Sequence, residues 1–275
     1  RIGRRSEYRA ILTGTPIAKG PMDLYMQFEF LDPEIIGMGD FYSYRRKYAV
    51  MGGFENKEIL GYQNIPELTE LLNPFIFQVR KEEAFKDAPP KIYERRQVRM
   101  NERQKAAYQD MKKLGKTRSD DGILSVKTIL ETMMRLQEIA GGFTTVLSEA
   151  GSLVKVRIPG VNPKLAEMLD VVSQYDGSTI VWCAFRMEIE MVAEALAQEY
   201  GQNSVVELHG NVSEADRDAN VNRFQSGASR FLVANAATGG MGLTLSAAEI
   251  EIYYSNTFSF IDREQSEERA FGSEK

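Results

Sequence analysis

The sequence predicts an α/β protein in which a parallel sheet carries helices on both of its faces. Three observations support this fold class. Short apolar runs alternate with helical patterns after Pro163, a glycine-rich loop follows one such run, and 275 residues suffice for two domains. A strand, a helix and another strand in succession imply a crossover connection, and such connections build parallel sheets that are covered on both faces.

The elements of this sheet are expected between Pro163 and the end of the chain. Strand-like apolar runs occupy residues 179–184, 204–208, 230–235 and 249–254. Apolar residues at helical spacing predict the first two helices: Leu165, Met168, Leu169 and Val172, then Ile189, Val192, Leu196 and Tyr200. Ser213 followed by Asp216 predicts the start of a helix that runs to about Gln225, and a last helix is expected from about Phe260.

The amino-terminal part, from about Ala10 to Phe77, predicts a mixed organisation. The run AILTGTPI at 10–17 is expected to be a short strand, and MDLYMQFEFLDP at 22–33 is expected to be a helix that Pro33 stops. A packed irregular segment is expected next, because aromatic residues and glycines mix there without a clear period. Its members are Phe41, Tyr42, Tyr44, Tyr48, Gly52 and Gly53.

The middle of the chain, residues 78–141, is charged and is expected to be mainly helical. Pro89 and Pro90 interrupt it, because two prolines cannot continue a helix. Apolar residues then return at helical spacing, at Val126, Ile129, Leu130, Met133 and Leu136. Residues 141–160 resemble a loop or a small hairpin.

The charge of the chain is unevenly distributed. The net charge is −5 and the pI is about 5.3. Between Arg80 and Arg118, however, 13 Lys or Arg stand against 6 Asp or Glu, so this stretch carries +7 while the rest carries −12. An acidic protein can therefore present one basic element to a polyanion, although a solvated helical face explains the charge alone equally well.

Three sequence features limit the class of protein. Cys183 is the only cysteine, which excludes an internal disulfide and fits a reducing compartment, and its apolar surroundings predict a packed thiol. No apolar run approaches the roughly 18 residues that a membrane helix requires, and no signal segment opens the sequence. The chain begins almost inside a strand-like run, so we expect it to be a piece of a longer protein.

The glycine-rich loop is the first candidate for a functional site. Gly239, Gly240 and Gly242 separate the apolar runs 231–234 and 250–254. Glycine allows a backbone to approach a phosphate or another chain closely, and in a parallel α/β sheet ligands bind at the carboxyl ends of the strands. An ordinary turn is the competing interpretation of the loop alone.

Ordered motifs support a resemblance to one family. LTGTPI at 12–17 resembles motif III of the Swi/Snf-type ATPases, within helicase superfamily two, and DLYMQFEFLDP at 23–33 resembles the helix after it. APPK at 88–91, followed by QKAAY at 104–108, is similar to the proline-proline-lysine signature of the family. These segments occur in the order of the family.

The same order continues to the end of the chain. Residues 162–196 resemble the start of the second RecA-like lobe, and LHGNVSEADRDANVNRF at 208–224 has the glycine, arginine and phenylalanine of the next motif. ATGGMGLTL at 237–245 resembles motif V, and QSEERA at 265–270 resembles the beginning of motif VI. The resemblance therefore covers almost the whole chain.

The resemblance implies a RecA-like fold and a motor function. In this family two RecA-like lobes clamp ATP between them and move along duplex DNA. The chain then divides into residues 1–77, the end of lobe one; residues 78–155, a helical insertion and linker; and residues 156–275, most of lobe two up to motif VI. ATP and Mg²⁺ are the implied cofactors, bound mainly by the part of lobe one that this sequence does not contain.

Two further features were tested as catalytic signals and set aside. LGKT at 114–117 matches the end of a phosphate loop, but Asp110 stands where the required glycine belongs, and the surroundings are those of a charged helix. The chain has no acidic box on a strand and no cluster of metal ligands. His209, the only histidine, is expected to be structural. The chain alone is therefore expected to be inactive.

Roles follow from the resemblance residue by residue. Arg269 and Gln265 match motif VI, whose arginines reach the γ-phosphate, and Gly240 and Gly242 would let motif V approach ATP. The residues implied in nucleic-acid binding or coupling are Thr13, Gly14, Thr15, Arg217, Thr238, Gly239, Arg95, Arg96, Arg99 and Arg103. A helix-face role for Arg217 and a solvent-facing Thr238 are the competing interpretations. No metal ligand is predicted.

Three function classes remain at this point. The first is the carboxyl-terminal part of a DNA-dependent ATPase and translocase, and the second is a non-catalytic remnant that binds nucleic acid or a partner. The third is another nucleotide-binding enzyme, such as a methyltransferase, which the ordered motifs disfavour. Gly272 stands where the family has a second motif VI arginine, and this departure bears on hydrolysis.

The expected partners are double-stranded DNA, ATP and the missing lobe one of the parent chain, with no membrane partner. The expected location is intracellular, cytoplasmic in a bacterium or phage and nuclear in a eukaryote. The sequence does not distinguish remodelling, repair, phage and restriction functions, and it does not decide between DNA and RNA, although the family that it resembles acts mostly on duplex DNA.

Overall fold

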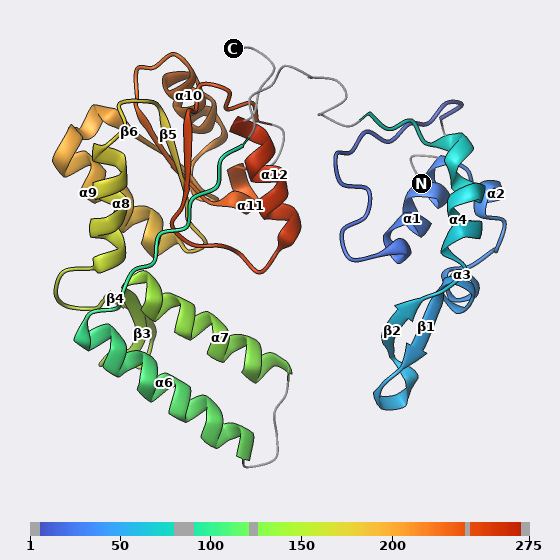
Figure 1. The fold of residues 1–275 in the computed structure, drawn as a ribbon, viewed down its shortest axis with the longest axis horizontal. Coiled ribbons are helices and arrows are strands. Elements are labelled where there is room, and N and C mark those ends of the chain that lie inside the picture. Colours follow the sequence, from blue (N-terminus) through green and yellow to red (C-terminus); the bar gives the residue numbers. More distant parts are fainter. Residues whose placement is uncertain (1–5, 80–90, 121–125, 240–242, 271–275) are drawn as a thin grey trace. The chain divides into compact units, whose positions relative to one another are not determined.

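The computed structural model describes residues 6–79, 91–120, 126–239 and 243–270. The chain divides into two compact units, Arg1–Pro89 and Pro90–Lys275 (Figure 1).

A parallel sheet forms the centre of the second unit (Figure 1). Its strands are β5 (Thr179–Trp182), β6 (Val205–Leu208), β7 (Phe231–Ala234) and β8 (Ile250–Tyr253). They lie in the order β6, β7, β5, β8, and every neighbouring pair is parallel. The chain passes from β7 to the far side of β5 before it forms β8, which requires crossover connections. The four predicted strands and the parallel sheet are confirmed.

Helices cover both faces of this sheet, as the alternating pattern predicted. They are α8 (Pro163–Ser173), α9 (Arg186–Tyr200), α10 (Glu214–Gln225), α11 (Ala236–Gly239) and α12 (Phe260–Ala270), with the short 3-10 helix η5 (Gln202–Ser204) after α9. Helices α8 and α9 pack on one face, and residues of α10, α11 and α12 pack on the other. The predicted start of α10 is confirmed, because the hydroxyl of Ser213 accepts a hydrogen bond from the backbone amide of Asp216.

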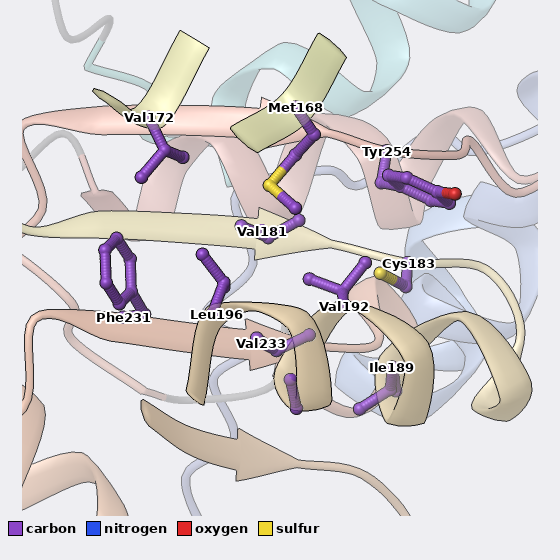
Figure 2. Close-up of a cluster of buried hydrophobic side chains, with 11 residues drawn as sticks. Met168, Val172, Val181, Cys183, Ile189, Val192, Leu196, Phe231, Val233 and Tyr254 are labelled. Atoms are coloured by element: carbon purple, nitrogen blue, oxygen red, sulfur yellow. The ribbon is translucent and has the colours of Figure 1, made fainter. Parts of the chain in front are cut away.

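Figure 2 shows the core between the sheet and helices α8 and α9. Met168 and Val172 reach it from α8, and Val192 and Leu196 reach it from α9. They pack around Val181 of the central strand, and all five side chains are buried. Full burial of one such side chain contributes about 1.5 to 3 kcal/mol to folding, so this face anchors both helices.

The opposite face has its own core because side chains alternate along a strand. Ile180 and Trp182 of β5 point into this second cluster, where Phe224 of α10 packs with them. Val181 and Cys183 point into the first cluster. The predicted packed thiol is confirmed, because Cys183 is buried and burial raises the pKa of this thiol. A strand that is apolar on both faces is therefore fully enclosed.

The second unit also contains a helical pair and a hairpin. Helices α6 (Glu102–Asp120) and α7 (Val126–Gly141) pack together, and strands β3 (Phe143–Leu147) and β4 (Leu153–Arg157) pair in antiparallel fashion. The structure thus decides between the loop and the hairpin that the sequence left open. The LGKT segment lies inside α6, so it does not form a phosphate loop.

One part of the predicted helical region is wrong. Residues 91–101 form no helix, so Arg95, Arg96 and Arg99 lie in an irregular segment, and only Arg103 lies in α6. The reason is tertiary, because Lys91 and Tyr93 bind helix α12, and Arg96 pairs with Glu94 and Glu167. These contacts hold the segment against the second unit in a conformation that helix propensity does not predict.

The first unit is built from short helices and one two-stranded sheet. Its elements are η2 (Pro21–Asp23), α1 (Leu24–Leu31), α2 (Pro33–Ile36), α3 (Phe41–Tyr48), β1 (Ala49–Gly52), η3 (Phe54–Asn56), β2 (Glu58–Tyr62), α4 (Ile65–Leu72) and η4 (Asn73–Phe75). The predicted helix after Met22 is confirmed. It ends at Leu31, and Pro33 begins the next helix after an Asp32 cap that accepts from the backbone amide of Glu34.

Two predictions for this unit are wrong. Residues 10–17 form no strand, because among the described residues β1 and β2 pair only with each other and provide no partner for this run. Leu12 is almost fully exposed. The predicted irregular segment is instead helix α3 followed by β1. Tyr44 and Tyr48 lie four residues apart on α3, so both point into the core of this unit, where neither is exposed.

No helix among the described residues is long and apolar enough to cross a membrane.

Candidate functional site

The carboxyl edge of the parallel sheet is organised by Asn235, the residue that follows β7. Its side-chain Nδ2 donates to the backbone oxygens of Cys183 (3.2 Å) and Ala184 (3.0 Å), which follow β5. Its Oδ1 accepts from the backbone amide of Ala237 at 2.9 Å and so caps the start of α11. One side chain thereby fixes the ends of two neighbouring strands and the entry to the glycine loop.

Ser255 fixes the end of β8 to the same edge. Its Oγ accepts from the backbone amide of Ala184 at 2.7 Å and donates to the carboxylate of Glu188. Glu188 is fully buried at the start of α9, and its other oxygen, Oε1, has no hydrogen-bond partner among the described residues. Burial raises the pKa of Glu188 and lowers the pKa of nearby Lys164. The edge is therefore held by buried polar groups.

Helix α11 begins the glycine loop directly at this edge. Thr238 and Gly239 lie in its last half, so the structure places their backbone after β7, as the resemblance implied. Gly240 and Gly242 lie outside the described residues. The loop therefore starts at the carboxyl end of a central strand, where ligands of parallel α/β sheets bind.

Helix α12 carries Gln265 and Arg269 and packs against α11. The backbone oxygen of Arg269 accepts a hydrogen bond from the amide of Leu245, just beyond the glycine loop, at 3.0 Å. Both side chains are partly buried. The structure thus brings the segments that resemble motifs V and VI together, although they are separated in the sequence.

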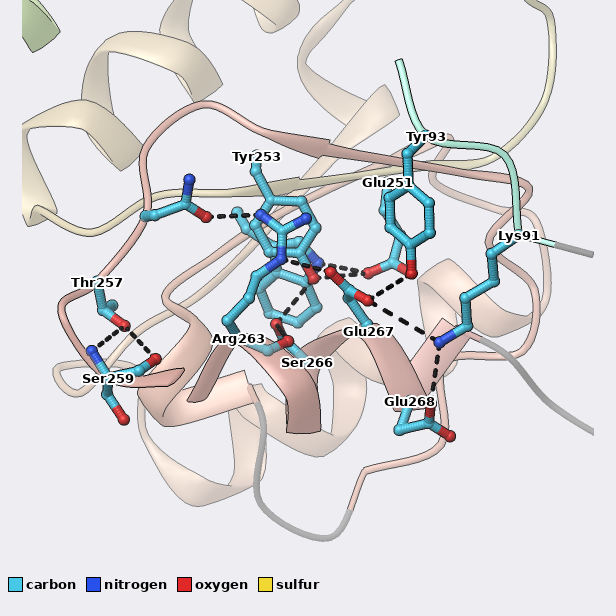
Figure 3. A network of polar contacts seen from close by, with 12 residues as sticks. Lys91, Tyr93, Glu251, Tyr253, Thr257, Ser259, Arg263, Ser266, Glu267 and Glu268 are labelled. Carbon is cyan, nitrogen blue, oxygen red and sulfur yellow. Dashed lines mark hydrogen bonds and ion pairs between the residues drawn. The ribbon is translucent and has the colours of Figure 1, made fainter. Parts of the chain in front are cut away.

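A polar network attaches α12 to the edge strand β8 (Figure 3). The hydroxyl groups of Tyr253 and Ser266 are 2.8 Å apart, and the guanidinium of Arg263 lies over the Tyr253 ring at 3.1 Å from its centre. Trp182 donates its indole N–H to Glu251 at 2.7 Å. Burial raises the pKa of Glu251 to about 7, since a carboxylate loses hydration there.

The other predicted site residues lie elsewhere. Thr13, Gly14 and Thr15 belong to the first unit, in an irregular segment where the Thr15 amide donates to the Thr13 hydroxyl at 3.2 Å. The edge of the sheet belongs to the second unit. Arg217 lies on α10, and its Nε is buried without a hydrogen-bond partner among the described residues.

The basic residues form no compact cluster with the edge. Arg95, Arg99 and Arg103 are exposed, and Arg96 is paired with Glu94 at 2.7 Å and Glu167 at 3.8 Å. A surface ion pair of this kind contributes about 0–1 kcal/mol. These side chains therefore remain accessible to solvent and to a polyanion.

Metal ligands are not gathered in the described parts of the chain. No three or more His, Cys, Asp or Glu side chains lie close enough together there to hold a metal ion. His209 contacts Glu207 at 3.5 Å and accepts from the amide of Asn211 at 3.3 Å, which is a local structural arrangement.

Sequence reasoning missed the residues that organise the edge. Asn235 carried a signal, because an asparagine before a helix is a preferred cap. Glu188 carried a weaker signal. It lies three residues after Phe185, the N-cap residue of α9, and a glutamate at that position is typical of a helix start. Ser255 and Glu251 carried none, because their partners come from other strands and helices.

Protein-family comparisons agree with this architecture. The family model of the SNF2-related domain matches residues 4–141, and that of the helicase conserved C-terminal domain matches residues 162–271. The C-terminal part of the Fun30 ATPase domain is similar in structure, with a TM-score of 0.54 and 14% identity over 68% of this chain and 82% of that one. The Sulfolobus solfataricus SWI2/SNF2 ATPase core in complex with dsDNA has a TM-score of 0.50 and 23% identity, over 89% of this chain and 51% of that one.

Curated relatives point to the same family. The putative ATP-dependent helicase/translocase YwqA of Bacillus subtilis is 24% identical over 94% of this chain and 28% of its own length. The protein CHROMATIN REMODELING 4 of Arabidopsis thaliana is 22% identical over 92% of this chain and 11% of its own length. The chain therefore spans less than a third of the length of these relatives.

The parallel sheet, its covering helices and the loop and helix at its edge define a RecA-like α/β fold. Within that class, the chain belongs to the SNF2-related, or Swi/Snf-type, family of superfamily-two helicases.

Proposed function

We propose that this chain is the carboxyl-terminal part of a DNA-dependent ATPase and translocase, and that it supplies the lobe-two side of an ATP site. The observation that carries the proposal is the packing of α12 against α11 at the carboxyl edge of the sheet, with the Arg269 oxygen bonded to the Leu245 amide. This contact joins an arginine-bearing helix to a glycine loop, the two kinds of element that recognise phosphates.

The residues of this chain can contact a nucleotide phosphate from one side of the site only. Arg269 and Gln265 offer cationic and neutral donors, and helix α11, which packs against their helix, leads into the glycine loop. The described part of the chain gathers no acidic ligands for Mg²⁺, which prefers carboxylate oxygens and water. When bound, Mg·ATP supplies the phosphoryl group. We assign its metal ligands and most of its contacts to the missing part of lobe one.

Within this site, Arg269 is the proposed catalytic residue. Charge spreads over the γ-phosphoryl oxygens in the transition state, and a guanidinium stabilises that charge through two parallel hydrogen bonds. Gln265, one helical turn earlier, lies on the same side of α12 and orients the same group. Gly240 and Gly242 permit close approach of the loop backbone.

The first experiment measures steady-state phosphate release with saturating duplex DNA. The isolated 275-residue chain is expected to show no turnover, because its sequence has neither a phosphate loop nor an acidic box. In the complete parent protein, Arg269→Ala is expected to lower turnover by about 10³-fold with ATP and DNA binding little changed. Arg269→Lys restores only part, because an ammonium lacks the planar fork.

Arg157→Ala is the matched control for this experiment. Arg157 is a half-exposed arginine of the same unit that pairs with Glu194, so its loss removes one guanidinium without touching α12. DNA-stimulated turnover of about 1 per second by the isolated chain would contradict the division of the site between two lobes. Near-normal turnover of a folded Arg269→Ala parent would contradict the role of Arg269.

We also propose a DNA contact for the exposed arginines Arg95, Arg96, Arg99 and Arg103, with coupling roles for Thr13, Gly14, Thr15, Arg217, Thr238 and Gly239. The exposure of the arginines and the +7 charge of residues 80–118 support the contact. A Swi/Snf-type neighbour was solved in complex with dsDNA, which supports duplex DNA as the partner.

The DNA proposal predicts binding that falls steeply with salt and depends little on sequence. Changing the four arginines to glutamate is expected to weaken binding by about tenfold or more and to reduce the salt slope by about one for each lost phosphate contact. The charge-matched control changes Arg46, Lys57, Arg157 and Arg186 to glutamate. An equal loss of DNA affinity in both variants would exclude this segment as the DNA contact. So would an affinity that is constant between about 50 and about 200 mM salt.

A non-catalytic remnant is the second candidate function. Gly272 stands in place of the second motif VI arginine, and this departure favours it. A complete parent that binds ATP and DNA but never releases phosphate would establish this alternative.

A further inference from the structure

The irregular segment after the first unit is bound to the back of the helix that carries Arg269. Lys91 and Tyr93, which we call the strap, reach α12 from residues far earlier in the chain (Figure 3). Lys91 Nζ lies 2.9 Å from the Glu268 carboxylate and 4.0 Å from that of Glu267. The Tyr93 hydroxyl donates to Glu267 at 2.9 Å.

The contacts of the strap are unevenly shielded, because Tyr93 is 68% exposed and the Glu268 side chain is 45% exposed. The side chains of Lys91 and Glu267 are only 29% and 19% exposed. Burial is the largest single effect and disfavours the charged ammonium, but the hydrogen bond to Glu268 and the charges of Glu268, Tyr93 and Glu267 together outweigh it and raise the pKa of Lys91. The hydrogen bond to Glu267 raises the pKa of Tyr93, so Tyr93 remains a donor at neutral pH. The strap therefore keeps a cation and a hydroxyl donor directed at two carboxylates.

Glu267, which both strap residues contact, lies on a different side of α12 from the proposed catalytic side chains, whereas Glu268, the nearer partner of Lys91, lies roughly 100° from Arg269 around the helix axis. Gln265 and Arg269 are four residues apart and share one side of the helix. Glu267 is two residues from each of them, which places it on roughly the opposite side. There it also accepts from Arg263 Nε at 2.5 Å, while Arg263 stacks on Tyr253. Glu267 thus joins the strap to the network that fixes α12 on β8.

We infer that Lys91 and Tyr93 are positioning residues for Arg269. By holding Glu267 and Glu268 they fix the rotation of α12 about its own axis, and rotation of this helix moves the Arg269 guanidinium away from its phosphate. This role rests on the proposed function of Arg269. It also gives a role to Lys91, the lysine of the APPK motif. This role does not require Lys91 to contact the nucleotide.

Steady-state kinetics of the complete parent protein, with ATP and duplex DNA, provide the first test. Lys91→Glu, which places a third carboxylate beside Glu267 and Glu268, is expected to lower kcat by about 10- to 100-fold with KM for ATP nearly unchanged. Lys91→Arg keeps most activity, and adding Glu268→Lys to Lys91→Glu restores part of it. In an Arg269→Ala background, Lys91→Glu is expected to have no further effect, because the strap acts through Arg269.

Hydrogen exchange of the α12 amides in the same parent protein provides a readout that does not depend on turnover. Lys91→Glu is expected to speed exchange over residues 260–270 by about tenfold and to leave strands β5 and β7 unchanged. Arg157→Glu, which breaks the surface pair with Glu194, is the matched control and leaves α12 unchanged.

The outcomes separate this inference from the proposed function. If Arg269→Ala abolishes turnover while Lys91→Glu changes neither kcat nor α12 exchange, the strap has no positioning role and the function stands. If Lys91→Glu still lowers kcat in the Arg269→Ala background, the strap acts elsewhere and the inference is wrong. If Arg269→Ala turns over normally, the proposed role of Arg269 fails and the positioning role of the strap fails with it, whatever the exchange data show.

Discussion

The two units of the chain bury aromatic side chains equally well but use different architectures to do so. In the second unit, apolar strands are enclosed between two helical layers, and Trp182 and Phe231 are wholly buried on opposite faces of one sheet. In the first unit, the core lies between short helices, and its two-stranded sheet is largely exposed, as at Leu60. The difference shows that an apolar run becomes a core strand only where neighbouring strands supply its hydrogen bonds.

The largest effect on this comparison is expected from Trp182→Ala. Trp182 fills the core of one face, stacks near Tyr253 and donates to Glu251, so its loss creates a cavity and leaves the partly buried Glu251 carboxylate with the more distant Tyr253 hydroxyl as its donor. We expect the free energy of unfolding of the second unit to fall by about 3 to 5 kcal/mol.

Hydrogen exchange resolved by unit measures this prediction. Amides of β5, β7 and β8 lose protection in Trp182→Ala, while those of α1, α3 and α4 in the first unit keep it. Equal loss of protection in both units would show that the chain unfolds as one body and that the comparison between the units is not valid for stability.

The second effect is a pH dependence confined to the second unit. Burial raises the pKa of Glu251 to about 7 from an ordinary value of 4.5. Between these values the folded state binds more protons than the unfolded state, so this group's contribution is fully present below pH 4.5 and is lost as pH rises to about 7. The loss amounts to about 3 kcal/mol.

Glu251→Gln tests this dependence, because glutamine still accepts from the Trp182 indole but does not ionise. Denaturant unfolding is expected to show that the variant is more stable than the unsubstituted chain at about pH 8. At about pH 4.5 the two are expected to be nearly equal in stability. Glu94→Gln removes an exposed carboxylate of the same unit and should not reproduce the effect. If the stability of the unsubstituted chain does not fall as the pH rises from 4.5 to about 7, the raised pKa of Glu251 is refuted.

The smallest effect concerns two tyrosines of the first unit. Tyr44 and Tyr48 are both fully buried on α3, but only the Tyr44 hydroxyl has a close acceptor, the backbone oxygen of Pro21 at 2.8 Å. The Tyr48 hydroxyl has no hydrogen-bond partner among the described residues. We expect Tyr44→Phe to cost about 1 kcal/mol and Tyr48→Phe to be neutral or slightly stabilising.

Thermal or denaturant unfolding of the two matched variants, with exchange of α3 amides, distinguishes them. Because each change removes one oxygen from one buried ring, the pair isolates the value of the hydrogen bond. A larger loss for Tyr48→Phe than for Tyr44→Phe would contradict the packing of this unit.

Hydrophobic periodicity predicted the second unit because its central strands, β5 and β7, are mostly apolar. Residues 179–184 and 230–235 are short apolar runs bounded by polar turns, and such runs bury their side chains inside a sheet. The same signal failed for residues 10–17, where Thr13, Gly14, Thr15 and Pro16 interrupt the apolar run and no pairing partner occurs among the described residues. Pairing depends on residues distant in sequence, and a local pattern does not contain them.

The site was predictable where one motif forms one local structure. The glycine loop that begins at Thr238 and the helix with Gln265 and Arg269 follow strands in the sequence, so their place at the carboxyl edge follows from parallel topology. Residues 91–101 of the basic stretch were predicted to be helical and form no helix. Their conformation depends on Glu267 and Glu268, which lie more than 170 positions further along the chain.

By itself, the sequence determined the α/β class, the order of strands and helices in the second unit, and membership of a family recognised by ordered motifs. Only the tertiary structure decided how Asn235 and Ser255 fix the edge of the sheet, and that the strap binds the back of α12. The physical reason is the distance along the sequence over which each kind of interaction acts. Periodicity and capping act within a few residues, whereas buried polar contacts join groups that folding alone brings together.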